Sequence, residues 1–206
     1  TERKIKVSMR SLMMVPSVAI VDPVLTYSLP PTITASTGLD ALTQVIEAYT
    51  SNKANPITDG FSREGIQRGA RFLIKAYRDG QDTVARENMS LTSLLSGLAL
   101  ANSGLGAVHG FAGVMGGMYA VPHGEICACL LSHVMKYNAK TLLKTVGKES
   151  IHHRYQEIAF WVTGVPHASI MEGIAWIENL AQELNIPNLR TMGIRREDFP
   201  EIIQKT

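Results

Sequence analysis

Two histidines and one aspartate in this chain are of the types that hold a metal ion. His109 lies in the segment Val-His-Gly at 108–110, and His123 lies in Pro-His-Gly at 122–124. Asp40 lies in Gly-Leu-Asp-Ala-Leu-Thr-Gln at 38–44. First-row divalent ions are commonly bound by imidazoles and carboxylates that converge on one point from separate helices. The three residues are therefore candidate metal ligands.

Each of the three also has an ordinary structural explanation. Thr37 is a suitable cap for a helix, which would place Asp40 in the first turn, where the helix dipole favours a carboxylate. Without a metal, His109 would be a hydrogen-bonded core histidine, and His123 would be a capping imidazole at a helix N-terminus. The spacing of the residues alone does not decide between these interpretations and a metal site.

Longer stretches of sequence around the three residues favour the metal site over these structural roles. They are Ala-Ile-Val-Asp-Pro at 19–23, Pro-Pro at 30–31, Thr-Gly-Leu-Asp-Ala-Leu at 37–42, Glu-Ala-Tyr at 47–49, Asn-Ser-Gly-Leu-Gly-Ala-Val-His-Gly at 102–110, Tyr119, Pro-His-Gly at 122–124 and Leu-Ser-His-Val-Met-Lys-Tyr-Asn at 131–138. Together they resemble the iron-containing (group III) alcohol dehydrogenases of the dehydroquinate synthase-like superfamily. The resemblance is close from residue 4 to residue 138 and loose beyond.

The resemblance implies a ligand set. In that family one aspartate and three histidines hold the ion, and Asp40, His109 and His123 match three of them. Gln44 stands where the family usually has the remaining histidine, on the same helix face as Asp40. Because an amide oxygen is a poorer ligand than imidazole for iron or zinc, we expect a weakened site, a site with water in the fourth place, or an empty one. Gly113 stands where the family often has a further histidine, and Lys6 where it presents a lysine toward the dinucleotide.

The resemblance also implies a fold and a reaction. The expected fold is mainly α: a helical metal and catalytic domain at 31–206, after a strand-containing lead-in at 1–30 that would be the end of a dinucleotide-binding domain. The expected reaction is hydride transfer between an alcohol or aldehyde and NAD or NADP, with Fe²⁺ or Zn²⁺ bound to the substrate oxygen. Because family members are longer and carry an N-terminal nucleotide-binding domain, this chain alone would be inactive. A homodimer is also suggested.

Two other functions stay open at this point. Gln44 and Gly113 favour a metal-free reductase similar to the maleylacetate reductases of the same superfamily, whereas Asp40 disfavours it. A non-catalytic helical module, used for assembly, is supported only by the lack of a glycine-rich phosphate loop in the chain.

Composition excludes several broader classes. The 206 residues are 45% hydrophobic, enough for a sizeable core, and the formal charge of +2 comes without a basic run, which argues against nucleic acid as a partner. No apolar segment is long enough to cross a bilayer, and no signal peptide is recognisable, so a cytoplasmic protein is expected. Cys127 and Cys129 are two apart on a predicted helix, where side chains point in different directions, so they are expected to be buried free thiols rather than a disulfide or a pair of metal ligands.

Hydrophobic spacing and end signals predict the elements. Short Val and Ile runs predict strands at 5–8 and 17–21. Helices are predicted from Thr37, from Asn55-Pro56 to Gly80, from Asp82 to Ala101, over 107–119, over 124–137, from His152, over 170–184 and from Arg196. The apolar stripe of the first helix leaves Glu47 on another face, and the helix from Asp82 is expected to be central and buried.

Overall fold

The computed structural model describes residues 11–14, 16–142 and 149–206. Its eight α-helices are α1 (Pro31–Tyr49), α2 (Pro56–Arg78), α3 (Thr83–Ser103), α4 (Ala107–Met118), α5 (His123–Leu142), α6 (Glu149–Thr163), α7 (Ile170–Glu183) and α8 (Phe199–Lys205). Three short 3-10 helices are η1 (Leu12–Met14), η2 (Pro23–Thr26) and η3 (Arg196–Asp198). The described residues contain no strand, which confirms the mainly α fold.

The predicted β lead-in is not found in the described residues. Residues 17–21 have no regular secondary structure, and the other predicted strand, at 5–8, lies outside the described residues. Val18 and Ile20 are exposed. A strand is stabilised by ladder hydrogen bonds to a neighbouring strand, and none of the described segments supplies one here, so the strand prediction for 17–21 is wrong.

Helix α1 forms the centre of the molecule. It packs against α2, α3 and α5, and residues such as Leu39, Leu42 and Val45 are completely buried. The helix begins at Pro31, which suits the first helical position because proline has no amide hydrogen to lose. Thr37 therefore does not cap it, and Asp40 lies in the middle of the helix rather than in its first turn, contrary to the prediction.

Helix α3 is less buried than its sequence suggests. Leu94 and Leu98 are 37% and 40% exposed, because only one face of α3 packs on α1 and α2. That face carries small and polar side chains such as Thr92, Ser96 and Ala99. The prediction of a central, fully surrounded helix thus applies to α1 and not to α3.

The predicted helix ends were more accurate. Asn55 caps α2 in a reciprocal capping box with Thr58, and Asp82 accepts a hydrogen bond from the backbone of Ala85 at the start of α3. Ser169 forms a second capping box at the start of α7.

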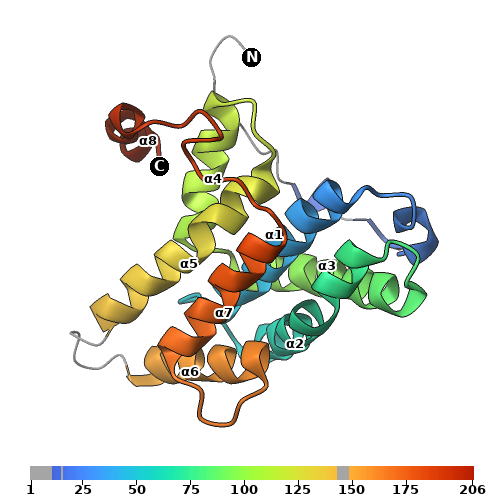
Figure 1. Cartoon of the computed structure of the whole chain (residues 1–206). Coiled ribbons are helices and arrows are strands. Elements are labelled where there is room, and N and C mark those ends of the chain that lie inside the picture. Colours follow the sequence, from blue (N-terminus) through green and yellow to red (C-terminus); the bar gives the residue numbers. More distant parts are fainter. Residues whose placement is uncertain (1–10, 15, 143–148) are drawn as a thin grey trace.

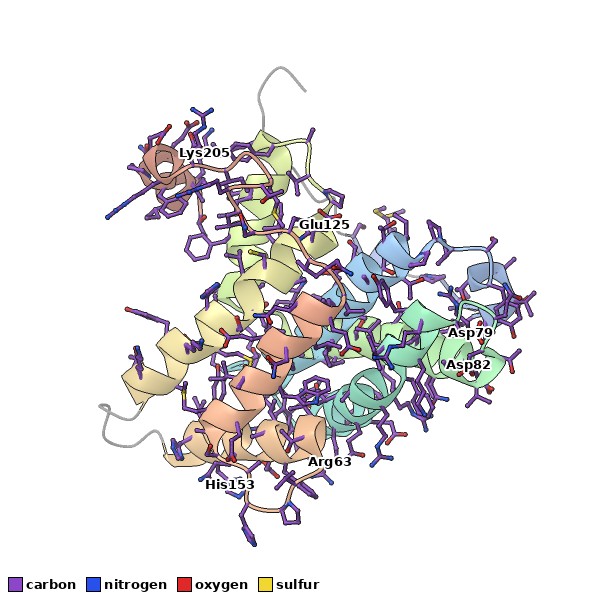
Figure 2. The ribbon with its side chains drawn as sticks, in the orientation of Figure 1. Arg63, Asp79, Asp82, Glu125, His153 and Lys205 are labelled. Carbon is purple, nitrogen blue, oxygen red and sulfur yellow. The ribbon has the colours of Figure 1, made fainter. Side chains whose placement is uncertain are left out.

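Asp79 and Asp82, in the turn between α2 and α3, lie on the opposite side of the molecule from Lys205 of α8 (Figure 2).

The remaining helices build outward from α1. Helices α5 and α7 run side by side, α6 packs against the lower part of α7, and α8 lies beside α4 (Figure 1). Gly173 brings α7 against α6, since a Cβ there would lie 2.6 Å from the backbone of Ala159. The result is a bundle in which α1, α4 and α5 meet near the N-terminal end of α5.

One ion-paired side chain joins three helices. Arg154 of α6 donates to both carboxylate oxygens of Asp59 on α2, at 2.6 and 2.8 Å, and to the backbone oxygen of Tyr49 at the end of α1, at 2.9 Å. Its guanidinium also lies over the Tyr49 ring, 4.5 Å from the ring centroid.

Replacing Arg154 with lysine should therefore destabilise the bundle although the charge is kept. A lysine ammonium cannot make the planar two-oxygen contact with Asp59 and reach Tyr49 at once. We expect Arg154→Lys to lower the free energy of unfolding by about 1–2 kcal/mol, measured by urea denaturation. Arg190→Lys, on the exposed loop after α7, is the control; equal stability of the two variants would contradict the joining role.

In the described part of the chain, no single helix has the length and apolar character needed to span a membrane; α3 and α4 together would meet these two criteria only as a pair bent by 102°.

Candidate metal centre

Four side chains from three helices converge at the junction of α1, α4 and α5. Asp40 comes from the middle of α1, His109 from the first turn of α4, and His123 and Cys127 from the start of α5. One potential ligand atom of each residue lies within 4.8 Å of those of the other three. Glu125, labelled in Figure 2, marks the first turn of α5 next to this cluster. The set Asp40, His109, His123 and Cys127 is called the cluster below.

Within the cluster, a carboxylate oxygen faces two imidazole nitrogens. Asp40 Oδ1 lies 3.3 Å from His109 Nε2 and 3.9 Å from His123 Nε2. The His109 and His123 rings are 5.5 Å apart between centroids. Asp40 Oδ1 and His109 Nε2 are buried, and neither makes a hydrogen bond of ordinary geometry with the described residues. Buried polar atoms without such bonds are costly, which points to a cation between them.

Glu47 fixes the orientation of His109. One carboxylate oxygen of Glu47 lies 2.7 Å from His109 Nδ1, and the other accepts a hydrogen bond from the backbone nitrogen of Val108 at 2.7 Å. Nδ1–H donation to Glu47 leaves Nε2, which faces Asp40 Oδ1, able to bind a metal ion once Nε2 has lost its own proton. A carboxylate behind a histidine in this way is the usual outer partner of a metal-binding imidazole.

Glu47 also caps helix α4. Gly106, at the cap position, has no side chain to accept from the first amides of α4, and Glu47 accepts from Val108 and His109 instead. A negative charge at a helix N-terminus is favourable. A Cβ on residue 106 would lie 2.7 Å from Glu47 Oε1, so glycine is what permits this approach.

Helix α5 approaches α1 equally closely. A Cβ on Gly124 would overlap the carbonyl oxygen of Ser36 and lie 2.8 Å from its carbonyl carbon. This contact sets the position of the neighbouring His123 relative to Asp40. By contrast, a Cβ on Gly113 of α4 would meet nothing within 4 Å, so no close helix contact requires glycine at this position.

Gln44 is engaged with its neighbours at the edge of the cluster. Its amide nitrogen donates to Asp40 Oδ2 at 3.1 Å, and its amide oxygen accepts from the Ser96 hydroxyl at 2.7 Å. Gln44, the predicted fourth ligand, therefore restrains the Asp40 carboxylate through Oδ2, the oxygen that does not face the histidines. Its own amide oxygen is already hydrogen-bonded to Ser96 of α3.

The charges in the cluster shift its titration. Burial alone lowers the pKa of His109, but the nearby carboxylates of Asp40 and Glu47 outweigh it and raise the pKa to about 9. Burial alone raises the pKa of Asp40, but interactions with His109, Cys127 and His123 outweigh it and the net pKa is lowered. In the metal-free chain a proton on His109 thus occupies the place where a cation would balance the two carboxylates, and metal binding has to displace it.

The cluster is within reach of solvent on one side. The exposed fraction of the side chain is 10% for His109, 22% for Asp40 and 28% for His123. The cluster is therefore partly open beside Asp40 and His123, whereas His109 is less exposed and Cys127 is completely buried.

The structure brings together Asp40, His109 and His123, places Gln44 beside Asp40, and leaves Lys6 outside the described residues. It adds Glu47 and Cys127. Glu47 is buried, and its position seven residues after Asp40 on the same helix face could have indicated it. Cys127 follows His123 by four residues, a spacing that places both side chains on one helix face and could have indicated Cys127 as well. Neither cysteine forms a disulfide, as expected, but only Cys127 is buried, whereas Cys129 is partly exposed, contrary to the expectation.

Comparison with known proteins places the geometry in a family context. Residues 34–206 match the model of the C-terminal part of the Fe-containing alcohol dehydrogenase family. The chain is 39% identical over 201 residues to alcohol dehydrogenase 4 of Saccharomyces cerevisiae, covering 96% of this chain and 50% of that protein. It is 40% identical over 202 residues to 1,3-propanediol dehydrogenase of Klebsiella pneumoniae, covering 97% of this chain and 51% of that protein.

A solved structure matches as well. The crystal structure of a 1,3-propanediol oxidoreductase superimposes with a TM-score of 0.83 at 38% sequence identity, covering 93% of this chain and 49% of that one. The chain therefore spans about half the length of the curated relatives it matches.

Proposed function

This chain belongs to the family of iron-containing alcohol dehydrogenases, and we propose that it forms the metal-binding half of a nicotinamide-dependent enzyme that interconverts an alcohol and its aldehyde. Relatives named for alcohol or propanediol oxidation support a small alcohol as substrate. The NAD or NADP site would lie in a dinucleotide-binding domain outside these 206 residues. A homodimer remains a prediction.

The observation that carries the proposal is the convergence of Asp40, His109 and His123 where α1, α4 and α5 meet. Two imidazole nitrogens face one carboxylate oxygen, and Glu47 and Gln44 hold the groups from behind. Nitrogen and carboxylate donors suit Fe²⁺ and Zn²⁺, so the residues present fit such an ion.

In this proposal Asp40, His109 and His123 hold the ion, and the other residues keep them in place. When bound, the ion would act as a Lewis acid that favours the alkoxide form of the alcohol, whose hydride passes to the nicotinamide. Glu47 accepts the Nδ1 proton of His109 and so keeps its Nε2 lone pair directed into the cluster. Gln44 restrains Asp40, and the partly exposed side beside His123 admits the substrate.

A metal-free reductase is the second candidate, because Gln44 replaces a family histidine and has its amide oxygen occupied by Ser96. In that case a protonated His109 between Asp40 and Glu47 would be the permanent state of the cluster. The non-catalytic helical module has no comparable observation in its favour.

Elemental analysis of the chain purified without chelators tests the proposal. We expect about one iron or zinc ion per chain. The chain joined to the dinucleotide-binding domain of a relative should then reduce NAD⁺ or NADP⁺ with propane-1,3-diol, and chelation should stop the reaction. Turnover without metal would favour the metal-free reductase, and metal binding without turnover would contradict the dehydrogenase assignment.

Glu47→Gln should weaken metal binding although Glu47 lies outside the cluster. A neutral amide accepts only weakly from His109 Nδ1 and no longer makes the imidazole more basic. We expect an affinity 10–100-fold lower, the usual cost of losing an outer partner, measured by competition with a chelating dye. Glu64→Gln on α2, an exposed carboxylate paired with Arg68, serves as the control; equal affinities of the two variants would contradict the role of Glu47.

A further inference from the structure

The thiol of Cys127 lies where a fourth metal ligand would lie. Cys127 follows His123 by four residues on α5, so both side chains are on one helix face. Its Sγ is 3.5 Å from His123 Nε2, and it belongs to the set of ligand atoms within 4.8 Å of one another. The residue is completely buried, at the floor of the cluster.

Gln44, which was expected to be the fourth ligand, makes hydrogen bonds with both ends of its amide group. The amide oxygen of Gln44 accepts from Ser96, and its amide nitrogen donates to Asp40. The chain thus lacks the histidine that its family usually has at position 44, and at the same junction it has a thiol. Loss of one donor is matched by the presence of another in a different helix.

We propose that Cys127 is the fourth protein ligand, so that the ion is held by Asp40, His109, His123 and the Cys127 thiolate. This rests on the proposed function only in requiring that the cluster binds a divalent ion. On binding, the Cys127 S–H bond breaks, its proton goes to solvent, and the sulfur electron pair forms the bond to the ion. No change of oxidation state is involved.

The thiolate changes which ion the site prefers. Within the four ligands, one carboxylate and one thiolate neutralise a dication, and the Glu47 carboxylate behind His109 adds one further negative charge, which favours retention of the cation. Zn²⁺ readily accepts a tetrahedral set of Asp, His and Cys ligands, and thiolate favours zinc over a hard-donor ion. The ligand set therefore selects zinc in a family whose name refers to iron.

Cys129 provides an internal control for this assignment. It lies two residues further along α5, on a different side of the helix, and is not among the converging ligand atoms. Cys129 is only partly buried, whereas Cys127 is completely buried in the cluster. A Cys129→Ser variant thus removes an equivalent atom without touching the cluster.

Cobalt substitution tests the proposal directly. The chain is stripped with a chelator and titrated with Co²⁺ alone while the absorption spectrum is recorded. A thiolate bound to Co²⁺ gives a near-ultraviolet charge-transfer band, which oxygen and nitrogen ligands do not. We expect this band in the unaltered chain and in Cys129→Ser, and its loss in Cys127→Ser. Zn²⁺ affinity, measured by displacement of Co²⁺, should fall more than about 100-fold in Cys127→Ser, beyond the effect of an outer partner.

The possible outcomes separate this proposal from the proposed function. Co²⁺ bound to the unaltered chain without the charge-transfer band overturns the role of Cys127 and leaves the metal site standing. Co²⁺ bound only after Gln44→His also overturns it, because the cluster then needs the third imidazole. No binding in either chain overturns the metal site itself. The band in the unaltered chain needs no variant, so a folding defect in Cys127→Ser does not obscure the result.

Discussion

Asp40→Asn is expected to abolish the retention of metal by the purified chain. The substitution keeps the size of the side chain but removes the anionic oxygen that faces His109 Nε2 at 3.3 Å and His123 Nε2 at 3.9 Å. Losing a direct ligand should reduce affinity by more than the roughly 10–100-fold that an outer partner contributes. Bound metal, measured by elemental analysis after gel filtration, should fall from about one ion per chain to almost none.

Thermal unfolding gives a second measurement of the same effect. A ligand present at about 100 times its dissociation constant stabilises the folded state by about 2.7 kcal/mol. For a chain of this size that corresponds to a rise in Tm of about 5–10 °C, expected for the unaltered chain and absent in Asp40→Asn.

Asp59→Asn is the matched control for Asp40→Asn. Asp59 is also a helical aspartate, with a side chain 24% exposed against 22% for Asp40, but it pairs with Arg154 and is not in the cluster. It should lower stability and leave the metal content unchanged. If Asp40→Asn retained metal as well as Asp59→Asn does, the cluster would not be the metal site.

The helical part of the fold could be predicted because its signals are local. Asn55, Asp82 and Ser169 each place a capping side chain at a helix start, and the apolar spacing of Ile174, Ile177 and Leu180 shows the buried face of α7. These residues act within one or two turns of the chain. The sequence alone therefore suffices to place most helices.

The predicted start of α1 was wrong because two local signals for a helix start compete in this segment. Thr37 is a good cap, but Pro30 and Pro31 come first, and proline in the first turn starts the helix six residues earlier. The Thr37 hydroxyl instead donates to the backbone oxygen of Ile33 within the helix. Asp40 then lies far from the N-terminus of α1, which is the positive end of the helix dipole. Stabilisation by the dipole therefore does not explain a carboxylate at this position.

Two residues of the site that the sequence analysis did not select as metal-site residues, Glu47 and Cys127, depend on contacts between helices. Glu47 acts on the first turn of α4, 61 and 62 residues further along the chain, and Cys127 joins the cluster because α5 crosses α1 closely at Gly124. Such crossings are decided by packing of several helices at once. Spacing can show that two residues share a helix face but not which helix that face meets.

Gly124→Ala should therefore disrupt both the bundle and the cluster. The added methyl group would overlap the carbonyl oxygen of Ser36 on α1, and a backbone atom in a buried helix cannot move aside as a flexible side chain can. Overpacking of this kind costs typically 1–3 kcal/mol, and a backbone clash lies at or above the upper end. We expect a loss of about 3 kcal/mol, a fall in Tm of about 6–12 °C, and weaker metal binding because His123 shifts with its neighbour.

Gly113→Ala separates this clash from a general effect of replacing glycine in a helix. A Cβ at position 113 of α4 meets nothing within 4 Å, so alanine adds helix propensity without overlap. That variant should gain about 0.5–1 kcal/mol. Differential scanning calorimetry of both variants measures the contrast. An unchanged Tm in Gly124→Ala would mean that α5 can move relative to α1 at no cost, and the rigid placement of His123 against Asp40 would then no longer explain how the cluster is held together.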